Sequence, residues 1–310
     1  MNCPLCRGQS AFLTDQLRRG NGTVYHCSGC DLGFLQGTET DYNGPYRQSA
    51  TPDCTTPQEI FLRYAPYQED RLKLIRPHLG ESILEFGASA GQFLHHVNVP
   101  RRCAVEPDEA CMAYMESHGI ARPGLLERFD TVCAFQVMEH TVDPVAFLTD
   151  ALGRLNPGGA AFIEVPNLYD PLRSVWRIPT YEKFYFHQDH RFYFSAKSLR
   201  KAAEMAGAAD MEIIPMQDYN VLNALHWITT GTPQADCRIG LSAPNFGQLT
   251  FEAIWLAREM KRVDAAYKEM LEQSGKTANL MLVVTAQTLP STDAAPPVSS
   301  TPPQSQSVRG

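Results

Sequence analysis

The sequence predicts an α/β protein built on a doubly wound parallel sheet, with a small cysteine-rich unit before the sheet and helical, aromatic segments after it. Three observations lead to this prediction. Apolar strands alternate with amphipathic helices between residues 58 and 165. Two C-x-x-C pairs lie within the first 30 residues. Aromatic side chains are dense between residues 167 and 195, beyond the fourth of these strands.

Composition limits the class of protein. The chain has 310 residues, 44% of them hydrophobic, and a formal net charge of −7, which fits one large domain or two small ones. The acidic balance counts against a nucleic-acid partner, because phosphate binding requires clustered Lys and Arg. We find no run of about 18 apolar residues and expect no membrane span. The N-terminus lacks the pattern of a signal peptide, so nine cysteines predict reduced thiols and a cytoplasmic protein.

Residues 1–36 predict a zinc ribbon. Each C-x-x-C pair places two thiolates on one tight turn, and two such turns supply four sulfurs for tetrahedral zinc. Asn21-Gly22 is a hairpin signal between the pairs, and 24–26 follows it as a strand. We expect a structural zinc, because four thiolates leave no open position for a substrate. The alternative is a set of free or redox-active cysteines. The expected ligands are Cys3, Cys6, Cys27 and Cys30.

The expected elements of the sheet follow a linker at 37–57. An amphipathic helix over 57–79 precedes the first strand. Strands are expected near 82–86, 102–106, 131–135 and 160–165, and helices near 91–97, 108–118 and 144–155. The segment 119–128 shows no clear strand.

The C-terminal part continues the pattern with longer insertions. Ser195 is the expected N-cap of a helix that ends near Gly207, and 211–216 is a strand. Residues 249–273 have the spacing of a long amphipathic helix, and 279–286 form a final strand. From residue 288 onward Pro, Ser and Thr dominate, so the tail 288–310 is expected to be disordered.

A glycine-rich stretch follows the first strand of the sheet. It runs Glu85-x-Gly87-x-Ser89-x-Gly91, with small residues between the glycines. Such a turn lets the backbone approach a ligand where side chains would block it. The second strand ends at Glu106, and a carboxylate at a strand tip suits the two hydroxyls of a ribose. These signals together predict a nucleotide-like ligand at this edge of the sheet.

The order and content of the four strands resemble class I S-adenosylmethionine-dependent methyltransferases, over roughly residues 58–290. The resemblance implies a Rossmann-like methyltransferase domain over 58–287, with substrate-pocket insertions at 167–195 and 217–275. It also implies S-adenosylmethionine as the cofactor. Glu85 would order the turn or bind the ammonium group, and Glu106 would hold the ribose. The full set of implied cofactor contacts is Glu85, Gly87, Ala88, Gly91, Glu106, Pro107 and Gln136.

The aromatic segment carries the candidates for acid–base chemistry. His187, His190 and Asp189 are the alternative bases, and the histidines suit the role because a neutral imidazole accepts a proton near working pH. Asp189 would orient the imidazole, and Tyr185 would assist. Residues 189–195 resemble a segment of zinc-containing sugar C-methyltransferases, in which His-Glu-His precedes Tyr-Phe-Ser; here Gln188 stands where the first His would be. Transfer to carbon, oxygen or nitrogen therefore stays open.

The predicted function is methyl transfer to a small-molecule acceptor, either a sugar nucleotide or a biosynthetic metabolite, by a monomer or homodimer. An RNA methyltransferase that recognises its substrate through the ribbon is one alternative. A non-catalytic binding protein with the cofactor fold is another. Glu139 and His140 follow the third strand, and we expect them to contact the cofactor, to act as the N-cap of the next helix, or to anchor the loop.

Overall fold

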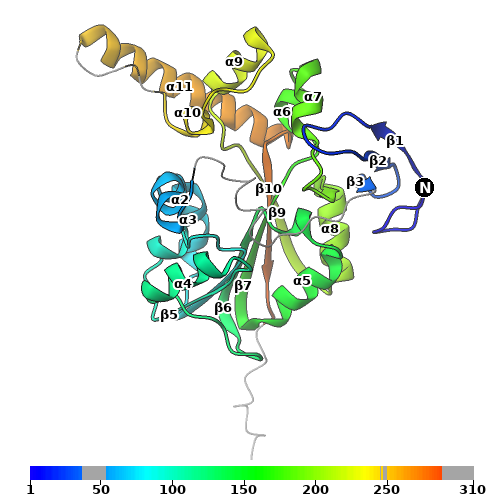
Figure 1. The fold of residues 1–310 in the computed structure, drawn as a ribbon, viewed down its shortest axis with the longest axis vertical. Helices are drawn as coiled ribbons and strands as arrows, with labels where there is room; N and C mark the ends of the chain where they lie inside the picture. The colour runs from blue at the N-terminus through cyan, green and yellow to red at the C-terminus, as the bar shows by residue number, and fades with distance from the viewer. Residues whose placement is uncertain (37–53, 245, 247–249, 288–310) are drawn as a thin grey trace, which may run out of the picture.

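A computed structural model describes residues 1–36, 54–244, 246 and 250–287. Two β-sheets organise these residues, a six-stranded sheet and a four-stranded one (Figure 1). The predicted disordered tail at 288–310 lies outside the described residues, as does most of the predicted linker, up to residue 53.

The large sheet confirms the predicted α/β class. Its strand order is β5-β4-β6-β7-β10-β9. The first four strands are parallel, whereas β10 is antiparallel to both of its neighbours. The carboxyl ends of the parallel strands therefore share one edge with the start of β10. The strands are β4 (Ser82–Phe86), β5 (Arg101–Val105), β6 (Phe129–Phe135), β7 (Leu155–Pro166), β9 (Asp210–Met216) and β10 (Asn279–Thr285).

Helices cover both faces of this sheet. Alternate residues of each strand face opposite sides, so Leu84 packs into one core and Ile83 into the other. The first core includes α5 and α8, and the second includes α3 and α4. Ser195 caps α8 as predicted and accepts the Ser198 N–H. The covering helices are α3 (Glu69–Ile75), α4 (Glu109–Ser117), α5 (Pro144–Gly153) and α8 (Ala196–Met205).

The N-terminal unit does not form its sheet alone. Strands β1 (Ser10–Thr14), β2 (Thr23–Cys27) and β3 (Leu32–Gln36) form an antiparallel meander. The fourth strand, β8 (Phe192–Tyr193), comes from the predicted aromatic insertion and pairs with β3. The ribbon is therefore hydrogen-bonded to the segment that follows the predicted catalytic histidines.

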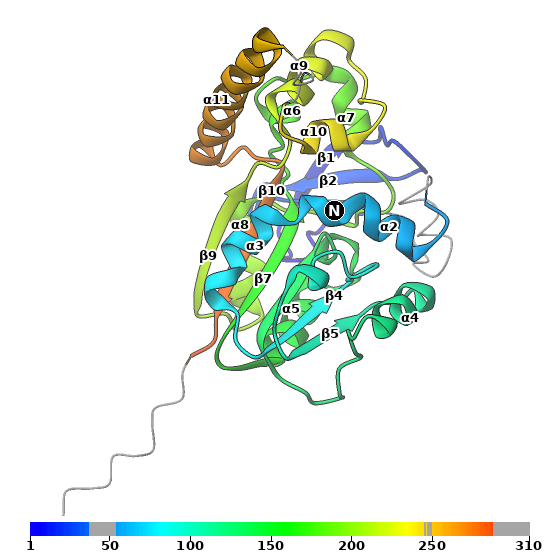
Figure 2. The same ribbon diagram turned by 90° about the vertical axis from the view of Figure 1, so that its left-hand side faces the viewer.

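A helical layer lies beyond the carboxyl edge of the large sheet (Figure 2). Its own core joins aromatic residues such as Tyr181, Trp227 and Tyr267. This layer contains most of the two segments that the sequence predicts as insertions, whereas β8 of the first insertion lies in the ribbon sheet. Its helices are α6 (Pro171–Ser174), α7 (Pro179–Tyr185), α9 (Val221–Thr230), α10 (Cys237–Leu241) and α11 (Phe251–Ser274).

Two sequence predictions of helices are wrong in detail. The helix expected over 57–79 is broken into α2 (Pro57–Tyr64), α3 and two 3₁₀ turns, η1 (Ala65–Tyr67) and η2 (Arg76–His78). Pro66 and Pro77 cause the breaks, because proline cannot donate a helical hydrogen bond. The helix expected near 91–97 is only a 3₁₀ turn, η3 (Leu94–His96). Residues 119–128 retain one parallel bridge, between Cys103 and Ala121.

Candidate functional site

The four predicted cysteine ligands form one cluster. Their sulfur atoms all lie within 4.8 Å of one another. Sγ of Cys3 is 3.5 Å from Sγ of Cys30, and Sγ of Cys6 is 3.4 Å from Sγ of Cys27. Four thiolates bound about 2.3 Å from zinc stand about 3.8 Å apart, so the arrangement fits a tetrahedral zinc ion. Cys3, Cys27 and Cys30 are buried, which leaves little room for an exchangeable ligand.

Both cysteine turns have the same backbone conformation. Arg7 and Asp31 each follow the second cysteine of a pair, and their φ angles are +63° and +64°. Their N–H groups donate to the carbonyls of Cys3 and Cys27, the first cysteine of each pair. A left-handed conformation is unfavourable for residues other than glycine. The same left-handed conformation occurs at equivalent positions of both turns. We infer that it serves one purpose, which is to bring the four sulfur atoms together.

The glycine-rich turn after β4 folds tightly against the tip of β6. Gly87 and Gly91 have φ angles of +66° and +74°. A Cβ atom on Gly87 would lie 2.5 Å from Cγ2 of Val137, so any side chain there would force a displacement. The Gly87 N–H donates to the Val105 carbonyl at 2.7 Å, which ties the turn to the end of β5. The turn therefore packs closely against the ends of β5 and β6, and its approach to a ligand stays a prediction.

Glu106 links the glycine turn to the next segment of the chain. Its Oε2 accepts the Ser89 N–H at 2.7 Å, and its Oε1 accepts the Asp108 N–H at 2.9 Å. Burial raises the pKa of this carboxyl, and the two backbone hydrogen bonds oppose the rise. Each carboxylate oxygen keeps a second acceptor direction. Glu106 can therefore hold the turn and still accept hydrogen bonds from the hydroxyls of a ligand.

A cavity of about 350 Å³ opens beside this turn. Among the predicted cofactor residues, Glu85, Gly87 and Ala88 line it, whereas the other four are not in its wall. The opposite wall comes from α2, η1 and α3, and from the segment after β9. Its lining residues are Tyr64, Pro66, Tyr67, Gln68, Glu69, Asp70, Arg71, Glu85, Gly87, Ala88, Ser89, Gln92, Phe93, Phe135, Met216, Asp218 and Leu241.

Glu85 is a buried carboxyl at the cavity wall. Only 4% of the residue is exposed, and its Oε2 has no hydrogen-bond partner in the described part of the chain. Burial raises the pKa of Glu85 to about 8, although Arg71 opposes the rise. A carboxylate with an unsatisfied oxygen fits a positively charged group in the cavity. It therefore suits the ammonium end of the cofactor that the resemblance implies.

A buried polar network continues along the same edge of the sheet. Arg71 binds Glu164 through Nε and Nη2, at 2.8 and 2.5 Å. Gln136 donates to Oε1 of Glu164 at 2.9 Å and to Oδ1 of Asn279 at 3.1 Å. Asn279 in turn donates to Oδ2 of Asp218 at 2.6 Å. The predicted cofactor residue Gln136 thus lies in a network that reaches α3 and β10.

Sequence reasoning missed this network except for Gln136. One signal was available, because Glu164 interrupts an otherwise apolar strand, and it is completely buried. A buried carboxylate requires a partner, which predicts a cation such as Arg71 without saying where it lies in the sequence.

Burial and the charge of Glu164 raise the pKa of Asp218 to about 7, although the nearby Arg71 opposes the rise.

Three of the four predicted catalytic residues converge in the loop between α7 and β8. Nδ1 of His187 is 3.6 Å from Oδ2 of Asp189, and the His187 and His190 rings are 3.8 Å apart. Burial lowers the pKa of His187, against the influence of Asp189. The fourth residue, Tyr185, donates its hydroxyl to the Asn167 carbonyl at 2.6 Å. That bond fastens the loop to the end of β7.

Glu139 and His140 lie against this histidine loop. They form a 3₁₀ turn, η4 (Met138–His140), directly after β6. The N-cap of α5 is Asp143, so the capping role expected as one alternative for Glu139 and His140 is wrong. Nδ1 of His140 is 2.6 Å from the Asp189 carbonyl, and Oε1 of Glu139 is 3.9 Å from Nε2 of His190. The turn and the histidine loop are therefore one structural unit.

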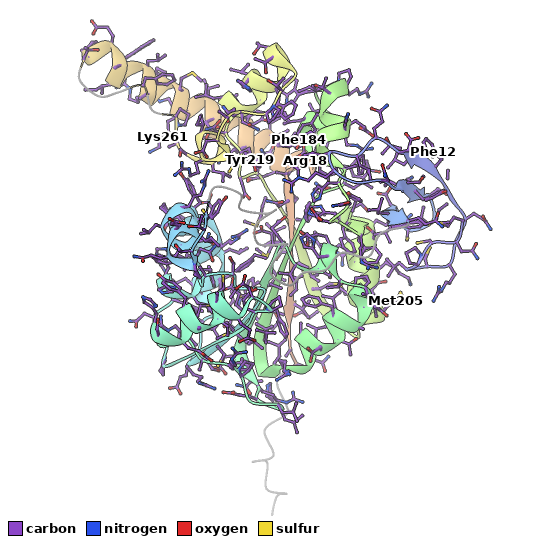
Figure 3. All side chains as sticks on the ribbon, in the orientation of Figure 1. Phe12, Arg18, Phe184, Met205, Tyr219 and Lys261 are labelled. Carbon is purple, nitrogen blue, oxygen red and sulfur yellow. The ribbon has the colours of Figure 1, made fainter. Side chains whose placement is uncertain are left out.

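The ribbon also contributes to this unit. The Arg18 N–H donates to the Phe186 carbonyl at 2.8 Å, and the guanidinium lies 4.5 Å from the centre of the Phe184 ring. Figure 3 shows Arg18, Phe184 and Tyr219 near one another, between the large sheet and the helical layer. Burial lowers the pKa of Arg18. The ribbon thus places a cation near the predicted catalytic loop.

Comparisons with known proteins agree with the class that the sheet and turn define. A profile of the methyltransferase-domain family matches residues 56–213, which are 158 of the 310 residues. Ubiquinone biosynthesis O-methyltransferase from Parvibaculum lavamentivorans is 46% identical over 41 residues, which are 13% of this chain and 16% of that protein. The match therefore spans about a sixth of that relative's length.

Two solved structures are similar to this chain. A SAM-dependent methyltransferase from Archaeoglobus fulgidus is 13% identical and superposes with a TM-score of 0.45, over 79% of this chain and 100% of the other. Phosphoethanolamine N-methyltransferase 2 from Haemonchus contortus is 11% identical, with a TM-score of 0.45, over 90% of this chain and 71% of the other.

The chain belongs to the methyltransferase-domain family, since the profile covers just over half of its length. Its class is that of the S-adenosylmethionine-dependent methyltransferases. The matched region contains the glycine turn, Glu106 and the histidine loop. Among the described residues, no helix is both long and apolar enough to cross a bilayer.

Proposed function

We propose that this protein transfers the methyl group of S-adenosylmethionine to a small-molecule acceptor. The observation that carries the proposal is the glycine turn between Glu85 and Glu106, which opens into a cavity lined by charged, polar and aromatic side chains. Such cavities, with a few buried charged groups among aromatic walls, are typical of small-molecule sites. The net charge of −7 is consistent with an acceptor other than a nucleic acid.

In this proposal the cofactor lies across the tips of β4 and β5. Glu106 holds the ribose hydroxyls, with Pro107 beside it, and the turn at Gly87, Ala88 and Gly91 admits the amino acid portion. Glu85 binds the ammonium group through its unsatisfied Oε2. Gln136 lies beside the reactive end, because it is the last residue of the β6 tip and is held by Glu164 and Asn279.

The bound cofactor supplies an electrophilic methyl group on a sulfonium. The chain then has to place an acceptor atom about 3 Å from that carbon, in line with the breaking bond. The residues proposed to do so line the cavity opposite the glycine turn, chiefly Tyr64, Tyr67 and Asp218. A sugar nucleotide or a biosynthetic metabolite is the proposed class of acceptor.

An acceptor that must lose a proton requires a base. We assign this role to the pair His187 and Asp189, in which the carboxylate orients the imidazole across 3.6 Å. His190 packs against the His187 ring and Tyr185 fixes the loop, so both act by positioning the pair. This assignment leaves transfer to carbon, oxygen or nitrogen open.

The cysteine cluster is proposed to hold a structural zinc. Four sulfurs close the coordination sphere, so the metal would stabilise the fold of the ribbon and take no part in the reaction. The ribbon would act on catalysis only through its contacts with the histidine loop, at Arg18 and at the β3–β8 pairing.

Calorimetric titration with S-adenosylmethionine and its demethylated product tests the proposal. Wild type should bind both in the micromolar range, and Glu106→Ala should bind them at least about tenfold more weakly, because the ribose loses its acceptor. Glu109→Gln is the matched control, since Glu109 is three residues away on the exposed side of α4. Folded, zinc-loaded protein that binds neither compound would refute a methyltransferase function.

A methylation assay then separates the acceptor classes. Labelled cofactor is incubated with nucleotide sugars, phenolic or amine metabolites, and total RNA. We expect transfer to a small molecule, with little dependence on salt. Transfer to RNA with a steep loss of activity between low and moderate salt would contradict the proposed acceptor class.

A further inference from the structure

One group of metal-binding side chains lies outside both the cavity and the cysteine cluster. Glu139, His140 and His190 each offer a ligand atom, and these atoms lie within 4.8 Å of one another. Oε1 of Glu139 is 3.8 Å from Nε2 of His140 and 3.9 Å from Nε2 of His190. Two atoms bound about 2.1 Å from one ion stand at most about 4.2 Å apart. The three ligand atoms can therefore share a cation after small side-chain shifts.

Glu139 lacks the partners that its burial requires. The residue is completely buried, and neither Oε1 nor Oε2 has a hydrogen-bond partner in the described part of the chain. A buried carboxylate without a partner is strongly unfavourable, because no interaction replaces its lost hydration. A bound cation would supply that interaction.

His140 is held in the orientation that a metal ligand requires. Its Nδ1 is 2.6 Å from the Asp189 carbonyl, so Nδ1 carries the proton and donates to that oxygen. Nε2 is then the unprotonated ring nitrogen, and it lies 3.8 Å from Oε1 of Glu139. Metal-binding histidines commonly donate their second ring N–H to a carbonyl or carboxylate in this way.

The site is also accessible. The side chains of His140 and His190 remain 13% and 15% exposed, although Glu139 is completely buried. An ion can therefore enter from the histidine side and reach the carboxylate.

We propose that Glu139, His140 and His190 bind a divalent transition-metal ion, separate from the ion of the cysteine cluster. Two imidazoles and one carboxylate suit zinc, iron(II) or cobalt(II), and three protein ligands leave at least one coordination position open. If methyl transfer is the function, as proposed above, this open position can take an oxygen of the acceptor and promote loss of its proton. Metal binding itself does not depend on that function.

The test is a titration of the zinc-loaded full-length chain with cobalt(II). We expect one equivalent of cobalt to bind with a spectrum that lacks thiolate charge-transfer bands, and to raise the unfolding temperature. Glu139→Gln and His190→Asn should each weaken cobalt binding by more than about 100-fold. His187→Asn is the matched control, because it changes the neighbouring imidazole and leaves the three ligands in place; it should bind cobalt like wild type.

Other outcomes would overturn the proposal. Wild-type protein that takes up cobalt only with thiolate bands binds it at the cysteines alone. Equal cobalt affinity in wild type and Glu139→Gln would remove Glu139 from the site. An equal loss of cobalt affinity in His187→Asn and His190→Asn would mean that the substitutions disturb the structure of the loop and that His190 is not a specific metal ligand. Calorimetry with S-adenosylmethionine on each variant shows whether the cofactor site is intact, so failure of the metal site is distinguishable from failure of methyl transfer.

Discussion

The proposed site has two halves, a proposed cofactor half and a proposed acceptor half, and the two are assembled in different ways. The cofactor half lies between Glu85 and Glu106, and its main hydrogen bond joins Ser89 to Glu106, 17 residues apart. The opposite half unites side chains from α3, β6, β7, β10 and the loop before β8; one of its hydrogen bonds, from Gln136 to Asn279, spans 143 residues. A local turn therefore defines the cofactor half, whereas sheet topology defines the acceptor half.

Removal of zinc should separate the two halves most strongly. Structural zinc contributes on the order of 10 kcal/mol to the folding of small zinc modules, so Cys30→Ser or a strong chelator should unfold the ribbon. Amide hydrogen exchange should accelerate in β1–β3 and across 186–193, since β3 pairs with β8. Affinity for S-adenosylmethionine should change by less than about threefold.

Cys237→Ser is the control for that experiment, because Cys237 is exposed and lies outside the cluster. Unchanged exchange near β8 after loss of zinc would mean that the acceptor loop is ordered without the ribbon.

Loss of the Arg71–Glu164 ion pair should have the second-largest effect, a loss of stability. Glu164 is completely buried, and Arg71→Met would leave its charge unpaired at a cost of about 3–5 kcal/mol in the free energy of unfolding. Arg101→Met is the matched control, since the Arg101 and Glu127 side chains are 42% and 28% exposed and their ion pair should contribute less than about 1 kcal/mol. Urea denaturation measures the free energy of unfolding of both variants. Similar losses of stability would contradict the conclusion that Arg71 neutralises a buried charge.

Gly87→Ala should have a smaller effect that is confined to the cofactor half. The substitution adds a methyl group 2.5 Å from Val137 in a left-handed conformation, for a cost of about 2–3 kcal/mol and roughly tenfold weaker cofactor binding. Gly207→Ala provides the comparison, because its φ is +90° but no neighbouring atom of the described residues lies within 4 Å of the new atom. The left-handed conformation alone should lower the stability of Gly207→Ala by about 1 kcal/mol. Equal losses in thermal unfolding would rule out the close packing at Gly87 as the cause.

The smallest expected effect is a pH dependence from Glu85. Burial raises its pKa from 4.5 to about 8, so between these pH values the folded chain keeps a proton that the unfolded chain has released. Stability should therefore fall as pH rises through this window, by at most about 1.4 kcal/mol per pH unit. Glu85→Gln should remove this part of the slope, whereas Glu109→Gln should not. Unfolding free energies at pH 6 and pH 7 measure it; an identical slope in Glu85→Gln would contradict the raised pKa.

Much of the fold follows from local sequence signals. Short apolar runs locate β4, β5, β6, β9 and β10 to within two residues, and Ser195 marks the start of α8. The C-x-x-C spacing brings the four cysteines together because each pair is fixed by its own turn. The glycine turn and the strand-end carboxylate are likewise contiguous signals. These features are encoded by neighbours in the sequence.

The remaining features depend on contacts between distant segments. Proline breaks divide the helix at 57–79, although its apolar spacing alone predicts one helix. The partner of Glu164 lies on α3, and nothing in the sequence around either residue specifies the pair. The contact of Glu139 with His190 requires the tip of β6 and the loop after α7 to meet, which only the completed fold arranges. Long-range tertiary contacts thus define most of the acceptor half.

The pairing of β3 with β8 also sets an order of folding during synthesis. Residues 1–36 leave the ribosome before Phe192, which follows Gln36 by 156 residues (192 minus 36). Strand β3 therefore has an unpaired edge while the parallel strands are being made, and such edges promote aggregation. Early capture of zinc would keep the three-stranded meander compact during this interval. The last strand to join the ribbon then brings the histidine loop into place, so the two sides of the site are completed at different times.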